Sequence, residues 1–180
     1  MNSARVLTYF DANVLVYRAQ ATVSSCPGMP SRVGPQVEAL ITDEGRQALT
    51  SDLGVLEFRN TLAKCCRNTQ PTMRSFNAEW MSDAVTGLMV LIKDGTLEVL
   101  TTRPQASQQA SALVDLAARN HGRAFGTWDT IHVITAAATA RERGASVEIV
   151  TADKGFAKFF DMYPQFGKSV NVLQLEDETE

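Results

Sequence analysis

Four acidic residues stand at positions where their carboxylates could work together. Asp11 and Asp153 each follow a short apolar run rich in β-branched residues, Glu57 lies within a helical pattern, and Asp129 precedes an alanine-rich helical pattern. Ionised carboxylates held close together repel one another and raise each other's pKa unless a cation neutralises them. Oxygen ligands of this kind favour Mg²⁺ or Mn²⁺. A divalent cation there could coordinate phosphate oxygens and activate water for attack on phosphorus.

Each of these residues also has a simpler interpretation when it is taken alone. An aspartate after a strand, such as Asp11 or Asp153, is commonly a turn former or a helix N-cap. Glu57 shares one helical face with Lys64 and Arg67, and such a face is often only solvated. The metal-site hypothesis therefore depends on the fold bringing all four carboxylates together.

Asp129 and His132 are three residues apart, which places both on one side of a helix. The helix dipole favours an ionised carboxylate in the first turn, where Asp129 is expected. For His132 we favour a partly buried, hydrogen-bonded histidine over a metal ligand. Trp128, beside Asp129, could stack on a nucleic-acid base, although a core or interface position is the more common one for tryptophan.

Strands and helices alternate along the predicted chain. We expect strands at 6–10, 147–151 and 170–175, with weaker candidates at 47–51 and 97–101. We expect helices at 36–45, 53–68, 72–93, 105–120 and 129–143, and a further helix starting at 154–156. This alternation predicts an α/β fold, a three-layer α/β/α sandwich with a central, mainly parallel sheet. In such a sheet ligands bind beyond the carboxyl ends of the strands, where Asp11 and Asp153 stand.

The length of 180 residues is typical of one domain, which we assign to residues 1–175, followed by an acidic tail at 176–180. Residues 23–35 hold three prolines and two glycines and are expected to form a loop. No apolar run is long enough to cross a bilayer and no secretory signal is visible, so we expect a cytoplasmic protein without membrane contact.

Charge and cysteine content exclude few functions. The net charge is −3, but four of the acidic residues belong to the tail, so the charge balance neither supports nor forbids an RNA substrate. The three cysteines, Cys26, Cys65 and Cys66, are too few for a disulfide framework and have no zinc-ligand spacing.

Four sequence blocks carry a resemblance to a known family. They are FDANVLVY at 10–17, SDLGVLEFRN at 51–60, DTIHVITA at 129–136 and VTADKGF at 150–156. In this order they resemble the PIN-domain family, especially the VapC-like toxins of bacterial toxin–antitoxin pairs. Each block is a common string by itself, and it is their order and spread that make the match specific.

The resemblance implies a metal-dependent endoribonuclease that hydrolyses RNA at a four-carboxylate site holding Mg²⁺ or Mn²⁺. By position, Asp11, Glu57, Asp129 and Asp153 would be the catalytic and metal-binding quartet. Asn13 and Thr151 would support this quartet. The family also implies an antitoxin protein as partner and a homodimer. From their charge, we expect phosphate contacts from Arg59, Lys64, Arg67, Lys154 and Lys158.

The chain departs from the family pattern in ways that concern substrate and partner more than the metal cluster. Ala12 stands where a threonine or serine is usual, and the region from about 20 to 50 is longer and richer in proline than in compact toxins. Two other functions stay open. One is a non-catalytic PIN-like scaffold that binds nucleic acid or protein. The other is a haloacid-dehalogenase-like phosphatase, which would need an aspartate where Asn13 stands.

Overall fold

The computed structural model describes residues 5–24, 32–67, 77–121 and 126–176. Five strands form one sheet in the order β3-β2-β1-β4-β5, and every neighbouring pair is parallel. The strands are β1 (Val6–Phe10), β2 (Arg46–Ser51), β3 (Leu97–Leu100), β4 (Val147–Thr151) and β5 (Val170–Gln174). The predicted strands are confirmed, and so is the α/β fold with a central parallel sheet.

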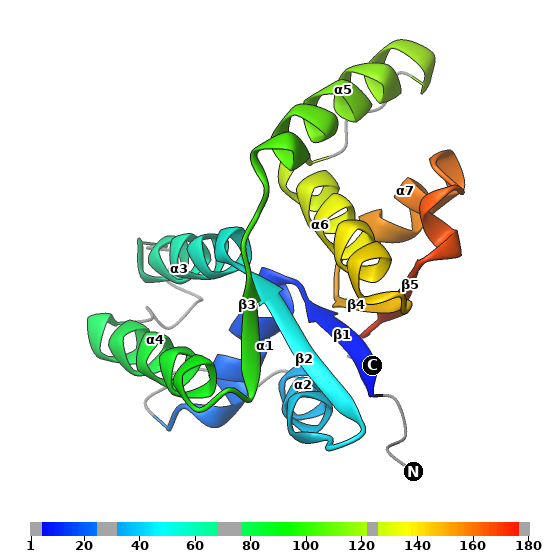
Figure 1. The fold of residues 1–180 in the computed structure, drawn as a ribbon. Coiled ribbons are helices and arrows are strands. Elements are labelled where there is room, and N and C mark those ends of the chain that lie inside the picture. The colour runs from blue at the N-terminus through cyan, green and yellow to red at the C-terminus, as the bar shows by residue number, and fades with distance from the viewer. Residues whose placement is uncertain (1–4, 25–31, 68–76, 122–125, 177–180) are drawn as a thin grey trace.

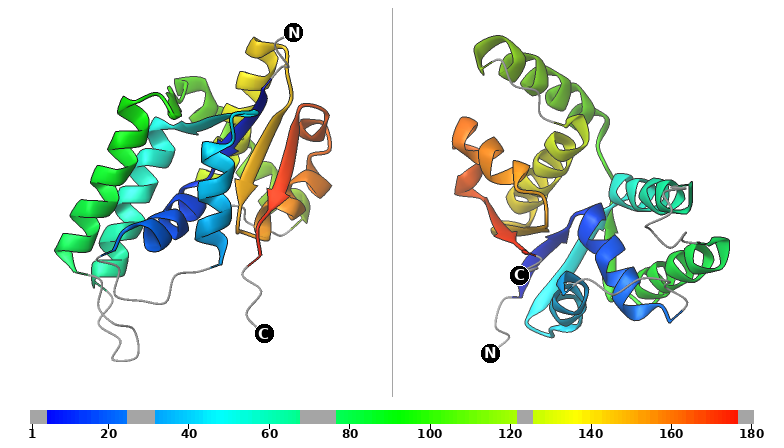
Figure 2. Two further views of the ribbon diagram at one scale, coloured as in Figure 1. Left: turned by 90° about the horizontal axis from the view of Figure 1, so that it is seen from below. Right: turned by 180° about the vertical axis from the view of Figure 1, so that it is seen from behind.

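Helices cover both faces of the sheet, as Figures 1 and 2 show. One layer holds α1 (Ala12–Thr22), α2 (Val33–Thr42), α3 (Asp52–Arg67) and α4 (Ala78–Lys93). The other holds α6 (Thr127–Arg143) and α7 (Gly155–Met162), with α5 (Pro104–His121) packed against α6 and a short 3₁₀ turn at Phe166–Lys168. The three-layer arrangement is therefore the one expected from the alternation of elements.

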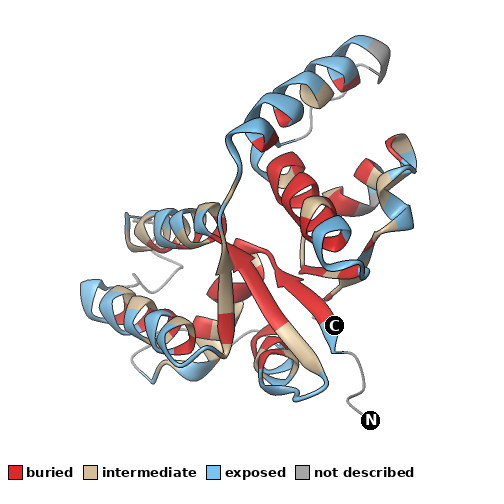
Figure 3. Ribbon diagram, viewed as in Figure 1, coloured by how far each residue is buried: buried red, intermediate tan, exposed pale blue. Residues whose placement is uncertain are grey.

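Each face of the sheet has its own apolar core, because successive residues of a strand point to opposite faces. On β1, Phe10 packs with α1, α3 and α4, whereas Tyr9 packs with α6 and α7. Both side chains have no exposed surface. Figure 3 shows β1, β2 and the sheet-facing side of α6 as mostly buried and β3 as mostly intermediate, while α5 is mostly exposed. Tyr9 thus enters the α6 layer two residues before Asp11, which follows the strand directly.

Two local features differ from expectation. The helix α1 was not predicted, because its first turns carry apolar and β-branched residues, Val14 and Val16 among them, that continue the pattern of the strand before it. Burial of this helix against the sheet decides its conformation. The expected loop at 23–35 is shorter at its end, since α2 already begins at Val33 and Pro35 lies in its first turn, where a missing N–H has no cost. Residues 25–31 and 72–76 lie outside the described residues.

The strand order defines where a ligand site is expected. The chain runs from β1 through β2 to β3 on one side and returns to β4 and β5 on the other side of β1. The carboxyl ends of β1 and β4 therefore flank the topological switch point, where open α/β sheets bind ligands. Within the described residues, no helix combines the length and the apolar character that a membrane span requires.

Candidate metal centre

Asp11 occupies the end of β1 and is almost fully buried, with 1% of its surface exposed. Its backbone N–H donates to the carbonyl of Val150 on β4 at 3.1 Å. The Thr151 hydroxyl donates to Asp11 Oδ2 at 3.0 Å and accepts a hydrogen bond from the backbone N–H of Asp153, also at 3.0 Å. Thr151 thus ties the first and last acidic residues together, and Asp11 Oδ1 lies 4.0 Å from His132 Nε2.

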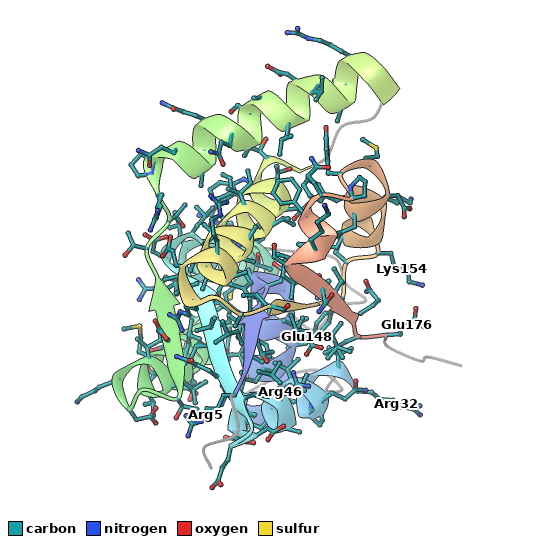
Figure 4. The ribbon with its side chains drawn as sticks, turned by 45° about the vertical axis from the view of Figure 1, so that its right-hand side comes forward. Arg5, Arg32, Arg46, Glu148, Lys154 and Glu176 are labelled. Atoms are coloured by element: carbon teal, nitrogen blue, oxygen red, sulfur yellow. The ribbon has the colours of Figure 1, made fainter. Side chains whose placement is uncertain are left out.

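Asp153 lies in the turn between β4 and α7. Its Oδ1 accepts a hydrogen bond from the backbone N–H of Gly155 at 2.7 Å, which fixes the carboxylate at the start of α7. The side chain of the neighbouring Lys154 is exposed, and its Nζ lies 3.8 Å from Glu176 (Figure 4). Such an exposed pair contributes little to stability.

Glu57 reaches the site from α3 and meets His132 of α6. The Oε2 atom of Glu57 lies 2.9 Å from His132 Nε2, and Asp11 Oδ1 lies 4.0 Å from the same nitrogen. One ligand atom from each of these three residues lies within 4.8 Å of the others. Among the described residues the tightest cluster of metal-ligand types is therefore two carboxylates and one imidazole.

Asp129 lies one helical turn before His132, at the N-terminus of α6. Its pKa is raised from 3.8 to about 6, first by burial and then by the negative charges of Asp11, Asp153 and Glu57, against the opposing effect of His132. The three other carboxylates thus lie within electrostatic range of Asp129, although Asp129 and Asp153 stand outside the tightest cluster.

Burial and neighbouring charges also shift the pKa values of Asp11 and His132, the two fully buried groups of the cluster. Burial raises the pKa of Asp11, and Glu57 adds to this effect, while His132 and the Thr151 hydrogen bond oppose it. Burial lowers the pKa of His132, but the hydrogen bond to Glu57 and the charges of Asp11, Glu57 and Asp129 outweigh it and raise the pKa above its ordinary value. His132 is completely buried. It is therefore part of the site, which is a larger role than its sequence context suggests.

The donor set fits a divalent cation. Four carboxylates approach one another from four separate elements. Burial is the main cause of the raised pKa values of Asp11 and Asp129, repulsion between the carboxylates adds to it, and a nearby cation would favour the ionised forms. Carboxylate oxygens are the ligands that Mg²⁺ and Mn²⁺ prefer.

The other predicted residues lie around this cluster rather than in it. Asn13 is half-buried on α1, two residues after Asp11. Lys64 and Arg67 are exposed on α3 and share the helical face of Glu57, whereas Arg59 is exposed roughly 200° around the helix from Glu57. Trp128 is 46% exposed, so it is not a core residue.

Tyr9, Ser51 and His132 share one buried hydrogen-bond chain; the sequence assigns no role to Tyr9 or Ser51, whereas the buried, hydrogen-bonded state expected for His132 is confirmed. The Tyr9 hydroxyl lies 2.6 Å from His132 Nδ1 and 2.8 Å from Ser51 Oγ. The spacing of Asp129 and His132 was the available signal, since it puts both on one helix face. Nothing in the sequence relates His132 to a tyrosine 123 residues away.

A first prediction concerns Gly126, which caps α6. A Cβ at this position would lie 2.4 Å from Asp129 Oδ2, so Gly126→Ala must displace the carboxylate. Because the far end of a side chain yields easily, we expect the melting temperature to stay within about 2 °C, a change below roughly 1 kcal/mol. Metal-dependent activity should fall about tenfold, the loss expected when an oriented ligand is misplaced.

The double variant Gly126→Ala/Asp129→Asn tests whether the effect passes through Asp129. It should be no less active than Asp129→Asn alone, because both changes act on one group. Additive losses would contradict this assignment.

A second prediction concerns Gly54 in the first turn of α3. A Cβ there would lie 2.6 Å from the Thr50 hydroxyl, which is fully buried and donates to the carbonyl of Phe10. Gly54→Ala must therefore push α3 away from β2 and carry Glu57 with it. We expect a destabilisation of about 1–3 kcal/mol, as in other overpacked sites, and a loss of activity.

Two further variants make this test specific. Thr50→Ala in the Gly54→Ala background removes the obstructing atom and should restore part of the melting temperature. Gly87→Ala on α4, where nothing lies within 4 Å of the new Cβ, should instead stabilise the protein by up to about 1 kcal/mol. Equal destabilisation by both glycine substitutions would refute the steric argument.

Comparison with known proteins gives matches in structure but not in sequence. No family model matches the chain, and no curated protein matches its sequence. A crystal structure of VapBC2 from Rickettsia felis bound to a promoter DNA fragment matches with a TM-score of 0.54 and 13% identity, covering 95% of this chain and 100% of that one. VapC20 of Mycobacterium tuberculosis, described as a sarcin–ricin-loop-cleaving toxin, matches with a TM-score of 0.52 and 13% identity, covering 84% and 94%.

A third match is FitAcB from Neisseria gonorrhoeae, with a TM-score of 0.51 and 17% identity, covering 93% of this chain and 96% of that one. At these identities the matches concern the fold, and they extend over nearly the whole length of both chains. The chain therefore has the PIN-domain fold of the VapC-like toxins.

Proposed function

We propose that this protein is a metal-dependent endoribonuclease and the toxin component of a toxin–antitoxin pair. The observation that carries the proposal is the convergence of Asp11, Glu57, Asp129 and Asp153 at the switch point of a PIN-type sheet. A buried carboxylate with a raised pKa is costly to maintain without a chemical role. The description of VapC20 as a toxin that cleaves the sarcin–ricin loop supports an RNA substrate.

In this proposal Asp11 and Asp153 hold the cation most directly, and Glu57 and Asp129 ligate it or orient a water molecule. When bound, the cation polarises the phosphodiester and lowers the pKa of water. Thr151 fixes the orientation of the Asp11 carboxylate, because its hydroxyl donates to Oδ2, and Oδ1 would be offered to the cation. Asn13 would support the cluster from α1.

The RNA backbone would approach across exposed basic side chains. Lys154 stands beside Asp153, and its exposed ammonium group lies 3.8 Å from Glu176. Lys64 and Arg67 extend along α3 on the face of Glu57. These cations would position the phosphate backbone without reading sequence, and Trp128, exposed beside Asp129, offers a ring on which an unpaired base could stack.

Incubation of the purified full chain with total cellular RNA tests the proposal. Discrete products in the presence of Mn²⁺ or Mg²⁺, abolished by a chelator, are the expected result. Mn²⁺ binding by calorimetry separates the alternatives: no binding at neutral pH would favour a non-catalytic scaffold. Turnover of a generic phosphomonoester without RNA cleavage would favour a phosphatase.

The partner and the assembly are part of the same proposal. The matched structures include toxin–antitoxin complexes, among them VapBC-5 from Mycobacterium tuberculosis, and we infer an antitoxin protein as partner and a homodimer of this chain. Light scattering of the purified chain tests the dimer. An apparent mass near 19.6 kDa would contradict it.

A further inference from the structure

A hydrogen-bond chain runs through the core directly beneath the carboxylates. It joins Ser51 at the end of β2, Tyr9 on β1, His132 on α6 and Glu57 on α3. Ser51, Tyr9 and His132 have no exposed surface, and Ser51 Oγ also accepts the backbone N–H of Gly54 at 3.0 Å. Three of the four residues thus lie in the rigid interior, and only Glu57 reaches solvent.

Counting hydrogens limits how this chain can be arranged. The Tyr9 hydroxyl has one hydrogen and two neighbours within bonding distance. If it donates to Ser51, then His132 Nδ1–H donates to Tyr9. If Ser51 donates to Tyr9, the Tyr9 hydroxyl donates to Nδ1. In both arrangements His132 Nε2 must carry a hydrogen, because a carboxylate oxygen of Glu57 at 2.9 Å can only accept.

The position of the imidazole ring is set from the sheet. Tyr9 lies at the centre of the parallel sheet between β2 and β4, so its hydroxyl has little freedom. The Tyr9 and His132 rings lie with their centroids 5.7 Å apart and their planes at 57°. A ring held at Nδ1 by Tyr9 presents Nε2–H in one direction only, toward Glu57 Oε2. The side chain of Glu57, 23% exposed, would otherwise rotate freely on its helix.

We propose that His132 and Tyr9 are positioning residues for Glu57: the Tyr9 hydroxyl, held by Ser51, orients the imidazole so that Nε2–H fixes the Glu57 carboxylate beside Asp11. The arrangement resembles the way outer hydrogen bonds orient ligands in metal sites, where loss of such a bond costs roughly 10–100-fold in affinity or activity. The role assigned to Glu57 rests on the proposed function. The hydrogen bonds themselves do not.

The first test is spectroscopic and uses the full chain without metal. Long-range ¹H–¹⁵N correlation at pH 7.5 reports whether Nε2 of His132 carries hydrogen, and the variant His121→Gln assigns the signals, since the chain has two histidines. We expect a protonated Nε2 that keeps its hydrogen when Mg²⁺ is added. An unprotonated Nε2 in the metal-free chain would remove the donor that the proposal assigns to His132, and loss of that hydrogen on adding Mg²⁺ would make His132 a metal ligand. Either result would overturn the proposal.

The second test compares two buried tyrosines. Tyr9→Phe removes the hydroxyl that holds His132, whereas Tyr163→Phe removes one that donates to the carbonyl of Leu113 at 2.9 Å, away from the site. We expect Tyr9→Phe to shift the Nδ1 resonance of His132 and to weaken Mn²⁺ binding about tenfold. Tyr163→Phe should do neither. Equal Mn²⁺ affinities and unchanged His132 signals in two folded variants would overturn the proposal.

Two substitutions of His132 distinguish a positioning role from a packing role. Gln at position 132 can place an amide N–H where Nε2 stood, while Leu fills a similar volume without a donor. His132→Gln should therefore retain more Mn²⁺ affinity than His132→Leu; equal loss in both would contradict the proposal. If the wild-type chain neither binds metal nor cleaves RNA, the proposed function fails, and the imidazole signals of wild type and Tyr9→Phe still decide the hydrogen-bond chain.

Discussion

Replacement of Asp11 by asparagine is expected to reduce metal-dependent RNA cleavage by at least about 100-fold. The substitution keeps the size of the side chain but removes the charge that, in the proposed function, holds the cation. Because a catalytic cation contributes several kcal/mol to such a reaction, loss of a principal ligand should cost two or more powers of ten in rate. Initial rates on a defined RNA, at saturating Mn²⁺ and pH 7.5, measure this effect.

The fold should survive this change. Asparagine can still accept the Thr151 hydroxyl, and burial disfavours the charged form of Asp11, so the metal-free variant should melt no lower than the wild type. Asp115→Asn, the same chemical change at an exposed position of α5, is the matched control and should keep activity within about twofold, as surface substitutions usually do. Unchanged cleavage by the Asp11 variant would show that the site is assigned wrongly.

The sheet could be predicted from sequence because its strands are buried on both faces. A strand covered by helices on both sides is a short continuous apolar run, and β1 and β4 were found with the boundaries expected. The helix α1 could not be found in the same way, because burial rather than helix propensity makes it helical. The order of the strands also lies beyond local patterns, since it depends on contacts between distant segments.

Only part of the candidate site could likewise be predicted from the sequence. Asp11 and Asp153 were predictable because parallel strands place their carboxyl ends at one edge of the sheet. The link between His132 and Glu57 was not, because it depends on how α3 and α6 cross beside the sheet. Histidine on an apolar helix face is usually a core residue, and His132 is indeed buried. What the sequence does not contain is the identity of its two partners, Tyr9 and Glu57.

The second large expected effect concerns Asp129 and the stability of the fold, rather than the rate of RNA cleavage. Its pKa is raised from 3.8 to about 6 in the folded chain, so the folded state holds this proton more tightly than the unfolded state. Stability from this group is therefore present below about pH 4 and is lost as pH rises through 6. Because Asp129 keeps some solvent contact, we expect a loss of about 1–2 kcal/mol, which is less than the full shift would give.

Asp129→Asn should remove this loss, so that the metal-free variant melts roughly 3–6 °C above the wild type at pH 7.5 and close to it at pH 4.5. The comparison between the two proteins matters, because His132, with its raised pKa, also makes the wild type less stable as pH rises. Mn²⁺ should stabilise the wild type at pH 7.5 much more than at pH 4.5, since protonated carboxylates bind cations poorly. A variant that melts below the wild type at pH 7.5 in chelator would mean that the Asp129 carboxylate stabilises the fold. The four carboxylates would then not destabilise the metal-free fold, and the argument for the metal centre would lose its electrostatic basis.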